Sequence, residues 1–289
     1  MYHGNIRSRG TQKIIGLIKI TRPVNSLIIG LSVLIGAIIG SSGLLLTQNV
    51  FLLILSVVFI SSAGHAINDV VDKDIDAVNK PYRPIPSGII TPKEAKIFSF
   101  VLFFVGTCIA LAVSLLSLII AALASLLLYM YAVYLKRKGF LGNLTIALLA
   151  FLTFVYGGTA TSITFLVLFP GYFALVLTLG REILKGIEDV EGDKIEGIET
   201  IAVKYGARSA RVVATSLLSL LVFTSELPYL LGYTSTIYLV IAAIGVDLPI
   251  VISLYLMHKN NIRAIITARR LTKYAMLFGV LAFIIDVLV

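Results

Sequence analysis

Long apolar stretches separated by short polar connections constrain the fold of this 289-residue chain more than any other feature. A helix needs about 20 mostly apolar residues to cross a bilayer. Strands of membrane barrels instead alternate apolar and polar residues over about 10 positions, and this sequence lacks that pattern. Only 13% of the residues are charged, against about 25% in soluble domains. The sequence therefore predicts an all-α membrane protein, a bundle of nine transmembrane helices in a single domain over 1–289, with spans at 24–46, 50–67, 97–114, 118–135, 141–161, 163–180, 212–230, 234–257 and 273–289.

The basic residues support this number of spans. Each of the 24 Lys and Arg residues falls in the N-terminal tail or around a connection that follows an even-numbered span. A wrong count would scatter them over both sides of the membrane. Because basic loops stay in the cytoplasm, we expect a multi-pass cell-membrane protein whose N-terminus and even-numbered connections are cytoplasmic. The net charge of +9 then reflects topology and is a poor indication of nucleic-acid binding.

A first cluster of carboxylates follows the second span, in the stretch INDVVDKDIDAVNKPYRPIP at 67–86. Asn68, Asp72 and Asp76 are spaced four residues apart, so a helix that continues from the span would align them on one face. Acidic groups stacked in this way repel one another unless a cation lies between them. Carboxylate and amide oxygens are hard ligands that suit Mg²⁺, so the stripe is a candidate metal site.

A second cluster follows the sixth span, in REILKGIEDVEGDKIEG at 181–197. Asp189 and Asp193 are again four residues apart, and Lys185 and Arg181 extend the same face backwards. Metal ligands beside cationic donors suit a diphosphate, whose oxygens complete a Mg²⁺ shell while Lys and Arg neutralise the remaining charge. With an apolar cavity for a hydrocarbon tail, these features together indicate an allylic prenyl diphosphate.

Other interpretations explain less of the pattern. A cation transporter would carry carboxylates deep in its spans, whereas all acidic residues except Glu226, Asp247 and Asp286 lie on the basic face. A membrane scaffold with charged loops gives no reason for two aspartate stripes, and neither does an ordinary solvated loop. An EF-hand fails because Ala77 and Arg83 stand where its loop needs Gly and Glu.

The two clusters resemble motifs of the UbiA superfamily of intramembrane prenyltransferases. The first is similar to the NDxxDxxxD motif, in which Asp69 stands next to Asn68. The second is similar to the DxxxD motif. RPVN at 22–25, YRPIPSG at 82–88 and YAVYLKRKGFLGN at 131–143 also resemble signatures of the family. The resemblance covers nearly the whole chain, including the number of spans and the order of the motifs.

This resemblance implies nine helices around a central cavity with a cytoplasmic cap, Mg²⁺ bound between the motifs, and ionisation of the prenyl diphosphate to an allylic cation. The implied metal ligands are Asn68, Asp72, Asp76, Asp189 and Asp193. The implied catalytic residues are Asp72, Asp76, Asp189, Asp193 and Lys136. The implied substrate-binding residues are Arg22, Asn25, Arg83, Tyr131, Tyr134, Arg137, Arg181 and Lys185.

Within the superfamily, REILKGIEDVEGD is most similar to the archaeal digeranylgeranylglyceryl phosphate synthases, although Gly186 stands where we expect a further aspartate. That resemblance implies transfer of geranylgeranyl to geranylgeranylglyceryl phosphate, which forms the second ether of archaeal lipids. The expected partners are an isoprenyl diphosphate, a lipid-phosphate acceptor and the bilayer, with no nucleic acid and no obligate protein partner. An aromatic prenyltransferase of quinone synthesis remains an alternative within the family.

The acceptor needs cations for its phosphate and a group that takes up the hydroxyl proton. Lys19, Arg22 and Arg137 are candidates for the phosphate, and the departing diphosphate is the expected proton acceptor. His65 lies three residues before the first motif and is interpreted as a structural histidine with satisfied hydrogen bonds. Asp247 and Asp286 fall within predicted spans, where carboxylates are functional candidates by default.

Overall fold

The computed structural model describes residues 9–41, 46–259 and 261–289. Within these ranges every regular element is a helix, which confirms the all-α prediction. The first eight residues of the predicted cytoplasmic tail and positions 42–45 of the first predicted span lie outside the described part. The elements are α1 (Arg9–Ile20), α2 (Pro23–Ser41), α3 (Gln48–Val71), α4 (Lys73–Asn79), α5 (Pro92–Leu111), α6 (Leu115–Val133), η1 (Leu135–Lys138), α7 (Phe140–Gly158), α8 (Phe165–Glu188), α9 (Val190–Ile195), α10 (Ile201–Ser225), α11 (Leu227–Leu230), α12 (Thr236–Ala242), η2 (Ala243–Asp247), α13 (Leu248–Met257) and α14 (Ile262–Leu288).

Nine helical segments in the described part are long and apolar enough to cross a membrane, as predicted. Three of them extend well beyond the predicted apolar runs, because α8 continues to Glu188, α10 begins at Ile201 and α14 begins at Ile262. Lys, Arg and Glu are good helix formers, so a charged residue ends an apolar run without ending the helix. The charged ends of these helices therefore carry side chains past the apolar region in a regular helical arrangement.

The helices form two compact units. Unit 1 consists of Met1–Leu31 and Phe51–Val133, and unit 2 consists of Ser32–Val50 and Tyr134–Val289. The first aspartate cluster belongs to unit 1 and the second to unit 2. The single domain expected from the sequence stays a prediction.

Small residues and serine hydroxyls join α3 to α5 in unit 1. The Ser56 hydroxyl donates a hydrogen bond to the backbone oxygen of Gly106 at 2.7 Å, and the Ser99 hydroxyl donates to that of Ala63 at 2.9 Å. Close packing of this kind with interhelical hydrogen bonds is typical of membrane helices. It holds α3, which leads into the first aspartate cluster, firmly against α5.

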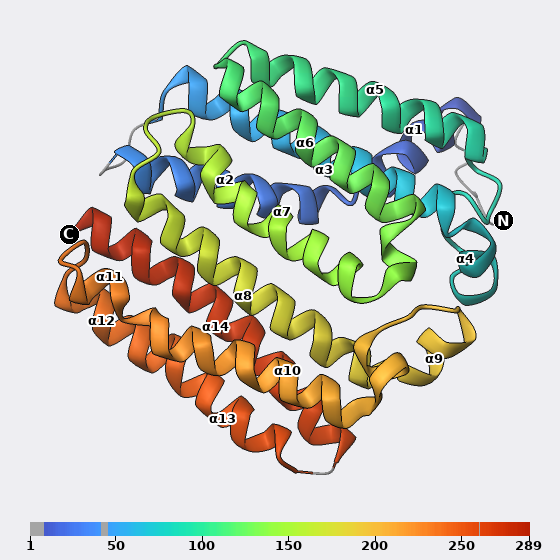
Figure 1. Cartoon of the computed structure of the whole chain (residues 1–289). Coiled ribbons are helices and arrows are strands. Elements are labelled where there is room, and N and C mark those ends of the chain that lie inside the picture. The colour runs from blue at the N-terminus through green and yellow to red at the C-terminus, as the bar shows by residue number, and fades with distance from the viewer. Residues whose placement is uncertain (1–8, 42–45, 260) are drawn as a thin grey trace, which may run out of the picture. The chain divides into compact units, whose positions relative to one another are not determined.

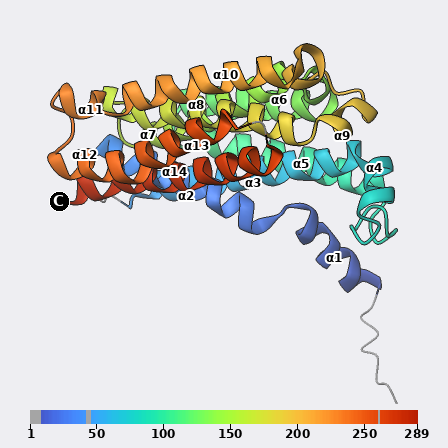
Figure 2. The same cartoon turned by 90° about the horizontal axis from the view of Figure 1, so that it is seen from below.

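Helix α8 lies in the middle of unit 2, where it contacts α7, α10 and α14 (Figure 1). The second half of α2 packs closely against α7, because a Cβ on Gly36 would lie 2.2 Å from the Phe154 oxygen and one on Gly157 would lie 2.1 Å from the Val33 oxygen. In both views α9 lies at one end of unit 2, and α11, α12 and the C-terminus lie at the other (Figures 1 and 2). The second aspartate cluster is thus at one end of a bundle of long helices.

The outer surfaces of the spans are strongly apolar. Phe104 on α5 and Phe223 on α10 are 70% and 82% exposed, and many other large apolar side chains are exposed as well. No Lys or Arg occurs in the sequence between Arg211 and Lys259. Such surfaces are unstable in water and suit a hydrocarbon environment, so the described helices are those of a multi-pass membrane protein.

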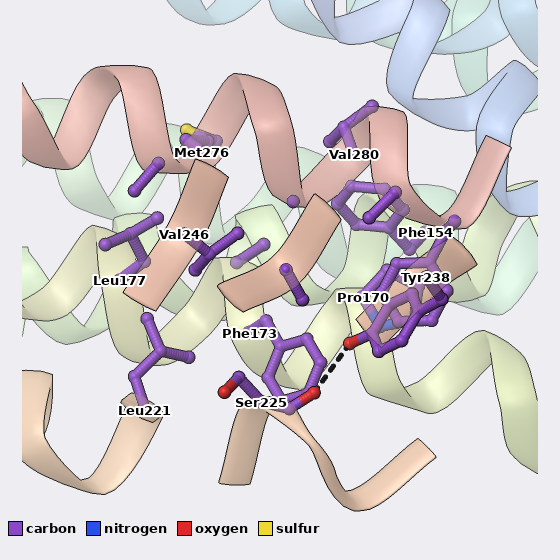
Figure 3. Close-up of a pocket in the computed structure, with 16 residues that line it drawn as sticks. Phe154, Pro170, Phe173, Leu177, Leu221, Ser225, Tyr238, Val246, Met276 and Val280 are labelled. Atoms are coloured by element: carbon purple, nitrogen blue, oxygen red, sulfur yellow. Dashed lines mark hydrogen bonds between the residues drawn. The ribbon is translucent and has the colours of Figure 1, made fainter. Parts of the chain in front are cut away.

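Unit 2 also encloses a small apolar cavity of about 40 Å³. Phe154, Phe173, Leu177 and Val246 are among the residues around it, and the Tyr238 hydroxyl near it donates a hydrogen bond to the Ser225 backbone oxygen at 2.7 Å (Figure 3). Cavities that hold drug-sized ligands have volumes of about 300 Å³ or more. This cavity is therefore too small for a prenyl chain.

Candidate active site

The first aspartate cluster lies where α3 ends and α4 begins. Helix α3 ends at Val71, Asp72 has φ −83° and ψ 8°, and α4 begins at Lys73. Backbone hydrogen bonds nevertheless keep the helical spacing, from Asp72 N–H to Asn68 O at 2.9 Å and from Asp76 N–H to Asp72 O at 2.8 Å. The predicted helical continuation through this stretch is confirmed.

The second cluster has the same construction. Helix α8 ends at Glu188, Asp189 has φ −96° and ψ 10°, and α9 follows at once. Hydrogen bonds run from Asp189 N–H to Lys185 O and from Asp193 N–H to Asp189 O, both at 2.9 Å. Asp72 and Asp189 therefore hold equivalent positions at the junction of a spanning helix and a short helix. Their backbone conformation is sparsely populated and is frequent among active-site residues.

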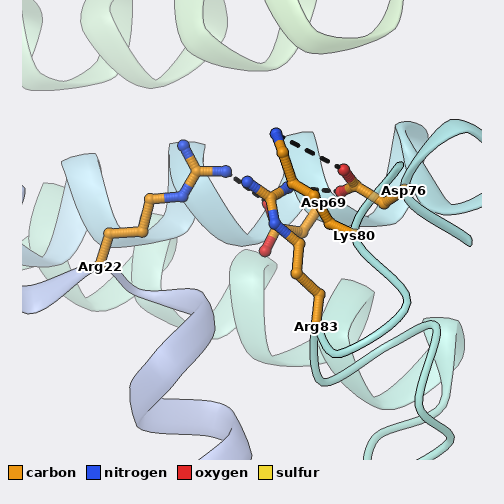
Figure 4. A network of polar contacts seen from close by, with 5 residues as sticks. All are labelled: Arg22, Asp69, Asp76, Lys80 and Arg83. Carbon is orange, nitrogen blue, oxygen red and sulfur yellow. Dashed lines mark hydrogen bonds and ion pairs between the residues drawn. The ribbon is translucent and has the colours of Figure 1, made fainter. Parts of the chain in front are cut away.

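Arginines neutralise the buried part of the first cluster (Figure 4). Asp69 and Asp76 have side chains only 7% and 6% exposed. Arg22 Nη2 lies 2.6 Å from Asp69 Oδ1, and Arg83 Nη1 contacts Asp69 Oδ1 at 3.3 Å and also Asp76 Oδ2. Lys80 Nζ is 4.0 Å from Asp76 Oδ1. Because a buried carboxylate without a partner is strongly destabilising, these contacts fix the shape of the cluster.

Arg22 reaches Asp69 from an unusual backbone conformation. It is the one non-glycine residue of the described part with a positive φ, 47°, and it occupies the turn between α1 and α2. Its carbonyl oxygen accepts the Asn25 N–H at 2.9 Å, which starts α2. A left-handed conformation at such a residue costs about 1–3 kcal/mol and is often found at functional sites. The turn therefore aims the Arg22 guanidinium at Asp69, while the Asn25 side chain is exposed.

The carboxylates of the second cluster repel each other. Burial raises the pKa of Asp193 to about 6, the Asp189 carboxylate adds to the rise, and Lys185 opposes it. Asp189 and Lys185 are exposed, whereas Asp193 is half-buried. On the preceding turn of α8, Arg181 Nη1 lies 3.0 Å from Glu182 Oε1. An added cation at the two aspartates would relieve their repulsion.

The segment with Lys136 and Arg137 is joined to the second cluster within unit 2. The Glu199 N–H donates to the Arg137 backbone oxygen at 3.1 Å, a few residues after Asp193. Gly139 has φ 53°, and a Cβ there would lie 1.9 Å from the Glu199 oxygen. Only glycine allows so close an approach. The structure thus brings η1 next to the segment that leaves the second cluster, as a shared site requires.

Aromatic side chains flank this basic segment. Lys138 Nζ lies 5.3 Å from the centre of the Tyr134 ring, a cation–π contact. Tyr134 is exposed and directly precedes η1, and Tyr131, three residues earlier in the chain, is half-buried in unit 1. The ring of Tyr134 is therefore already engaged with a cation.

The donor set fits a hard divalent cation by its chemistry. Each cluster offers carboxylate oxygens at helical spacing, and Asn68 adds an amide oxygen, which are ligands that Mg²⁺ prefers. In the described part, no group of three His, Cys, Asp or Glu side chains is close enough to hold a metal ion by itself. Mg²⁺ commonly binds one or two carboxylates together with waters and substrate phosphates. A site that is completed by a diphosphate is consistent with this arrangement.

Several buried polar groups were missed or misread in the sequence. His65 Nε2 is buried without a hydrogen-bond partner among the described residues, so the interpretation of His65 as a satisfied structural histidine is wrong. Glu188, next to Asp189, forms two hydrogen bonds with Arg269 of α14, at 2.8 and 3.2 Å. Glu188 and Arg269 are 81 positions apart in the chain, so no local pattern revealed the pair.

Asp286 and Gly186 have local explanations, whereas Asp247 has none. Asp286 Oδ1 accepts hydrogen bonds from the Ser235 N–H at 2.8 Å and from its hydroxyl at 2.5 Å, so it fixes the start of α12. Asp247 ends the π-helical stretch η2, and its Oδ1 is buried without a partner in the part of the chain that is described. Gly186 is buried against Thr200, whose Cβ would lie 3.4 Å from a Cβ at this position. An aspartate there would face Thr200.

Comparison with known proteins identifies a family. The profile of the UbiA prenyltransferase family matches residues 29–283. The digeranylgeranylglyceryl phosphate synthase of Methanosphaera stadtmanae is 38% identical over 267 residues, which cover 92% of this chain and 96% of that enzyme. The enzyme of the same name from Sulfolobus acidocaldarius is 43% identical over 225 residues, which cover 77% of this chain and 80% of that enzyme.

Solved structures of this family have a similar fold. One that is reported for digeranylgeranylglyceryl phosphate synthase has a TM-score of 0.85 and 34% identity, and covers 95% of this chain and 98% of the other. A UbiA homologue from Archaeoglobus fulgidus, bound to DMAPP and Mg²⁺, has a TM-score of 0.71 and 19% identity, and covers 93% of this chain and 99% of the other. At 19% identity the likeness concerns the fold.

Proposed function

Because the chain belongs to the UbiA prenyltransferase family, we propose that it transfers a geranylgeranyl group from geranylgeranyl diphosphate to the free hydroxyl of geranylgeranylglyceryl phosphate. The product is the diether phosphate that carries the second ether bond of archaeal lipids. The observation that carries this proposal is the similarity to digeranylgeranylglyceryl phosphate synthases, at 38% identity over nearly the whole length of one of them. Both aspartate clusters lie in the part of the chain that the family profile matches.

Mg²⁺ is the cofactor in this proposal, and its ligands come from both clusters. The chemistry of the oxygens supports the choice, as does the Mg²⁺ in the structure of the A. fulgidus homologue, which shares the fold. When bound, the ion stabilises negative charge on the leaving diphosphate. The proposed ligands are Asn68, Asp72, Asp76, Asp189 and Asp193.

Basic side chains bind the remaining diphosphate charge. Lys136, Arg181 and Lys185 serve this role, and Arg83 joins them. Arg83 contacts both Asp69 and Asp76 through Nη1, and a guanidinium has five N–H donors. Its Nε and Nη2 groups can therefore donate to phosphate oxygens while Nη1 stays on the carboxylates. Arg83 thus couples the position of the first cluster to the position of the diphosphate.

The reaction breaks the bond between C1 of the prenyl group and the diphosphate oxygen, and the electron pair leaves with the diphosphate. The allylic cation is attacked by the hydroxyl oxygen of the acceptor, and the departing diphosphate takes the proton. The ring of Tyr131 or Tyr134 contributes a π-face near the cation. An apolar environment keeps water away from the cation, which prevents hydrolysis to the free alcohol.

The acceptor needs its own cationic contacts. Arg22 and Asn25, with Arg137 and Lys19, bind the glycerol phosphate in this proposal. Arg22 engages Asp69 through Nη2, and its other N–H groups have the geometry to form a fork to phosphate oxygens. Its position beside the first cluster would bring the acceptor close to the prenyl donor.

The N-terminus and the connections that follow the even-numbered spans face the cytoplasm in this proposal. The support is the positive-inside rule, because every Lys and Arg belongs to this side. Labelling tests it. In a Cys108→Ser background, Lys93→Cys should be protected from a membrane-impermeant maleimide in right-side-out vesicles, and Tyr233→Cys should react. The opposite labelling would contradict the orientation.

An aromatic acceptor is the alternative within the family, and a transfer assay separates the two. Purified protein in detergent receives Mg²⁺ and labelled geranylgeranyl diphosphate, with geranylgeranylglyceryl phosphate, 4-hydroxybenzoate or a naphthoate in parallel tubes. The proposal predicts EDTA-sensitive label in a diether phosphate. Label on an aromatic acid would instead indicate an enzyme of quinone synthesis. Absence of transfer to any acceptor, together with absence of diphosphate binding, would favour a cation transporter.

A further inference from the structure

A groove with basic and hydroxyl residues along one wall lies between α10 and the end of α13, outside both aspartate clusters. It belongs entirely to unit 2 and has a volume of about 560 Å³. None of the residues around it is acidic. They are Arg208, Arg211, Val212, Thr215, Ser216, Met257 and His258.

The basic residues of the groove are gathered by a break in α10. Gly206 has φ 84° and ψ 159°, so the helix that crosses the membrane begins again just after it. Arg208 and Arg211 therefore fall in the first two turns of that long segment. Cations are unfavourable near the N-terminus of a helix, where the dipole is positive. An anion in the groove would be attracted by both arginines and by the helix.

His258 lies on the opposite wall of the groove. Its Nδ1 lies 2.8 Å from the Leu254 backbone oxygen, and since a carbonyl oxygen only accepts, Nδ1 carries the proton. This contact fixes the ring and leaves Nε2 to face a ligand, to which it donates only in the imidazolium form. Lys259, the next residue, lies over the Tyr255 ring at 4.9 Å, which keeps a further positive charge near the same helix end.

The groove changes from charged to apolar along α10, in the direction of the membrane interior. Arg208 and Arg211 stand at its start, the hydroxyl residues Thr215 and Ser216 follow one turn later, and the exposed Leu220 continues the same face. Val212, at 60% exposed, lies among the polar residues. A phosphate headgroup with acyl or isoprenoid chains has the same sequence of properties. A soluble anion would leave the apolar part uncovered.

We propose that this groove binds the phosphate headgroup of an anionic lipid of the surrounding bilayer, with its chains along α10. Charge-assisted hydrogen bonds from arginine forks to phosphate are strong and geometrically specific. The lipid is a resident of the membrane and is distinct from the reacting acceptor, so the inference stands apart from the proposed transfer. It would anchor the end of α10 that follows the second aspartate cluster.

Native mass spectrometry of the full chain in detergent tests the proposal, with dioleoylphosphatidylglycerol titrated against dioleoylphosphatidylcholine. The test variant is Arg208→Gln with Arg211→Gln. The control is Lys93→Gln with Lys96→Gln, two exposed residues of α5 whose replacement removes the same charge. Thermal unfolding confirms that each variant is folded. Each basic residue near an anionic lipid strengthens the binding of that lipid. The test variant lacks two such residues, so its affinity for phosphatidylglycerol should be roughly tenfold lower. The control variant should bind phosphatidylglycerol as tightly as the unmodified chain does.

Four results would overturn the proposal. One is equal binding of the two lipids by the unmodified chain, and another is equal loss of phosphatidylglycerol binding in test and control variants. The third is displacement of the lipid by inorganic phosphate at the same concentration, which would assign the groove to a soluble anion. In the transfer assay, a tenfold rise in the KM for geranylgeranylglyceryl phosphate in the test variant alone would assign it to the acceptor instead. If no transfer occurs at all, the lipid-binding result still decides the proposal.

Discussion

Arg22 and Asp69 are 47 residues apart in the chain and lie 2.6 Å apart in the structure, from Nη2 to Oδ1. Arg22 adopts a left-handed conformation with φ 47°, and the Asp69 side chain is 7% exposed. The contact ties the turn between α1 and α2 to the first aspartate cluster. Arg22 was expected only to bind the acceptor, and it also supports the structure of the first cluster.

Replacement of Arg22 should therefore weaken the protein. In Arg22→Asn the backbone conformation is retained, because Asn tolerates positive φ, while the ion pair is lost. Among the described residues, the ion pair left to Asp69 is then the longer one with Arg83, at 3.3 Å. Loss of a partner to a buried group costs about 1–3 kcal/mol, so the temperature of thermal unfolding should fall by several degrees. The exposed Lys19, changed to Asn, provides a control with the same loss of charge, and an equal fall in both variants would contradict this role.

The aspartates of the second cluster should be essential for transfer. Asp189→Asn and Asp193→Asn each remove a charged oxygen ligand, and turnover should fall by at least about 100-fold without loss of fold. Glu191→Gln is the matched control, because Glu191 lies on the same short helix with its side chain 82% exposed. Product formation measured over a range of Mg²⁺ concentrations checks the effect. Turnover of Asp193→Asn close to that of the control would remove Asp193 from the site.

Gly139 should tolerate no side chain. A Cβ would approach the Glu199 oxygen to 1.9 Å, and φ is 53°, so Gly139→Ala must displace η1 from the segment after α9. Thermal stability and turnover should both fall. Gly192 has no neighbouring atom within 4 Å of its Cβ position and lies in a helix, so Gly192→Ala should leave stability equal or slightly higher. Normal unfolding and turnover of Gly139→Ala would mean that this approach is unimportant.

The pair of Glu188 and Arg269 should depend on the fork of the guanidinium. Arg269→Lys keeps the charge and loses one of the two hydrogen bonds, at 2.8 and 3.2 Å, which should cost about 1 kcal/mol. The unfolding temperature should fall by about 2–4 °C. Arg270→Lys at the exposed neighbouring position should cause no change. A larger fall in Arg270→Lys than in Arg269→Lys would contradict the assignment.

The sequence predicted the number of spans and the helical spacing of both clusters because these are local properties. Apolar runs and four-residue repeats can be read directly along the chain, and they led to Asn68, Asp72, Asp189 and Asp193. The helices α8, α10 and α14 were predicted too short, because charged residues end an apolar run although they continue a helix.

Contacts between distant residues were not predictable in the same way. Arg22 pairs with Asp69 because of one backbone angle at a turn, and nothing in RPVN specifies that angle. The equivalent backbone conformations of Asp72 and Asp189 were also not predictable, since spacing alone does not reveal the break between two helices. His65 illustrates the remaining difficulty, because a sequence does not show whether a buried nitrogen finds a partner.

A competition in one tube tests the central claim most directly. Purified protein receives Mg²⁺, labelled geranylgeranyl diphosphate and equal concentrations of geranylgeranylglyceryl phosphate and 4-hydroxybenzoate, and the products are identified by mass spectrometry with an EDTA-treated sample beside them. The account predicts that nearly all transferred label appears in digeranylgeranylglyceryl phosphate and that EDTA abolishes it. Label that accumulates on the aromatic acid, or transfer that persists in EDTA, would contradict it.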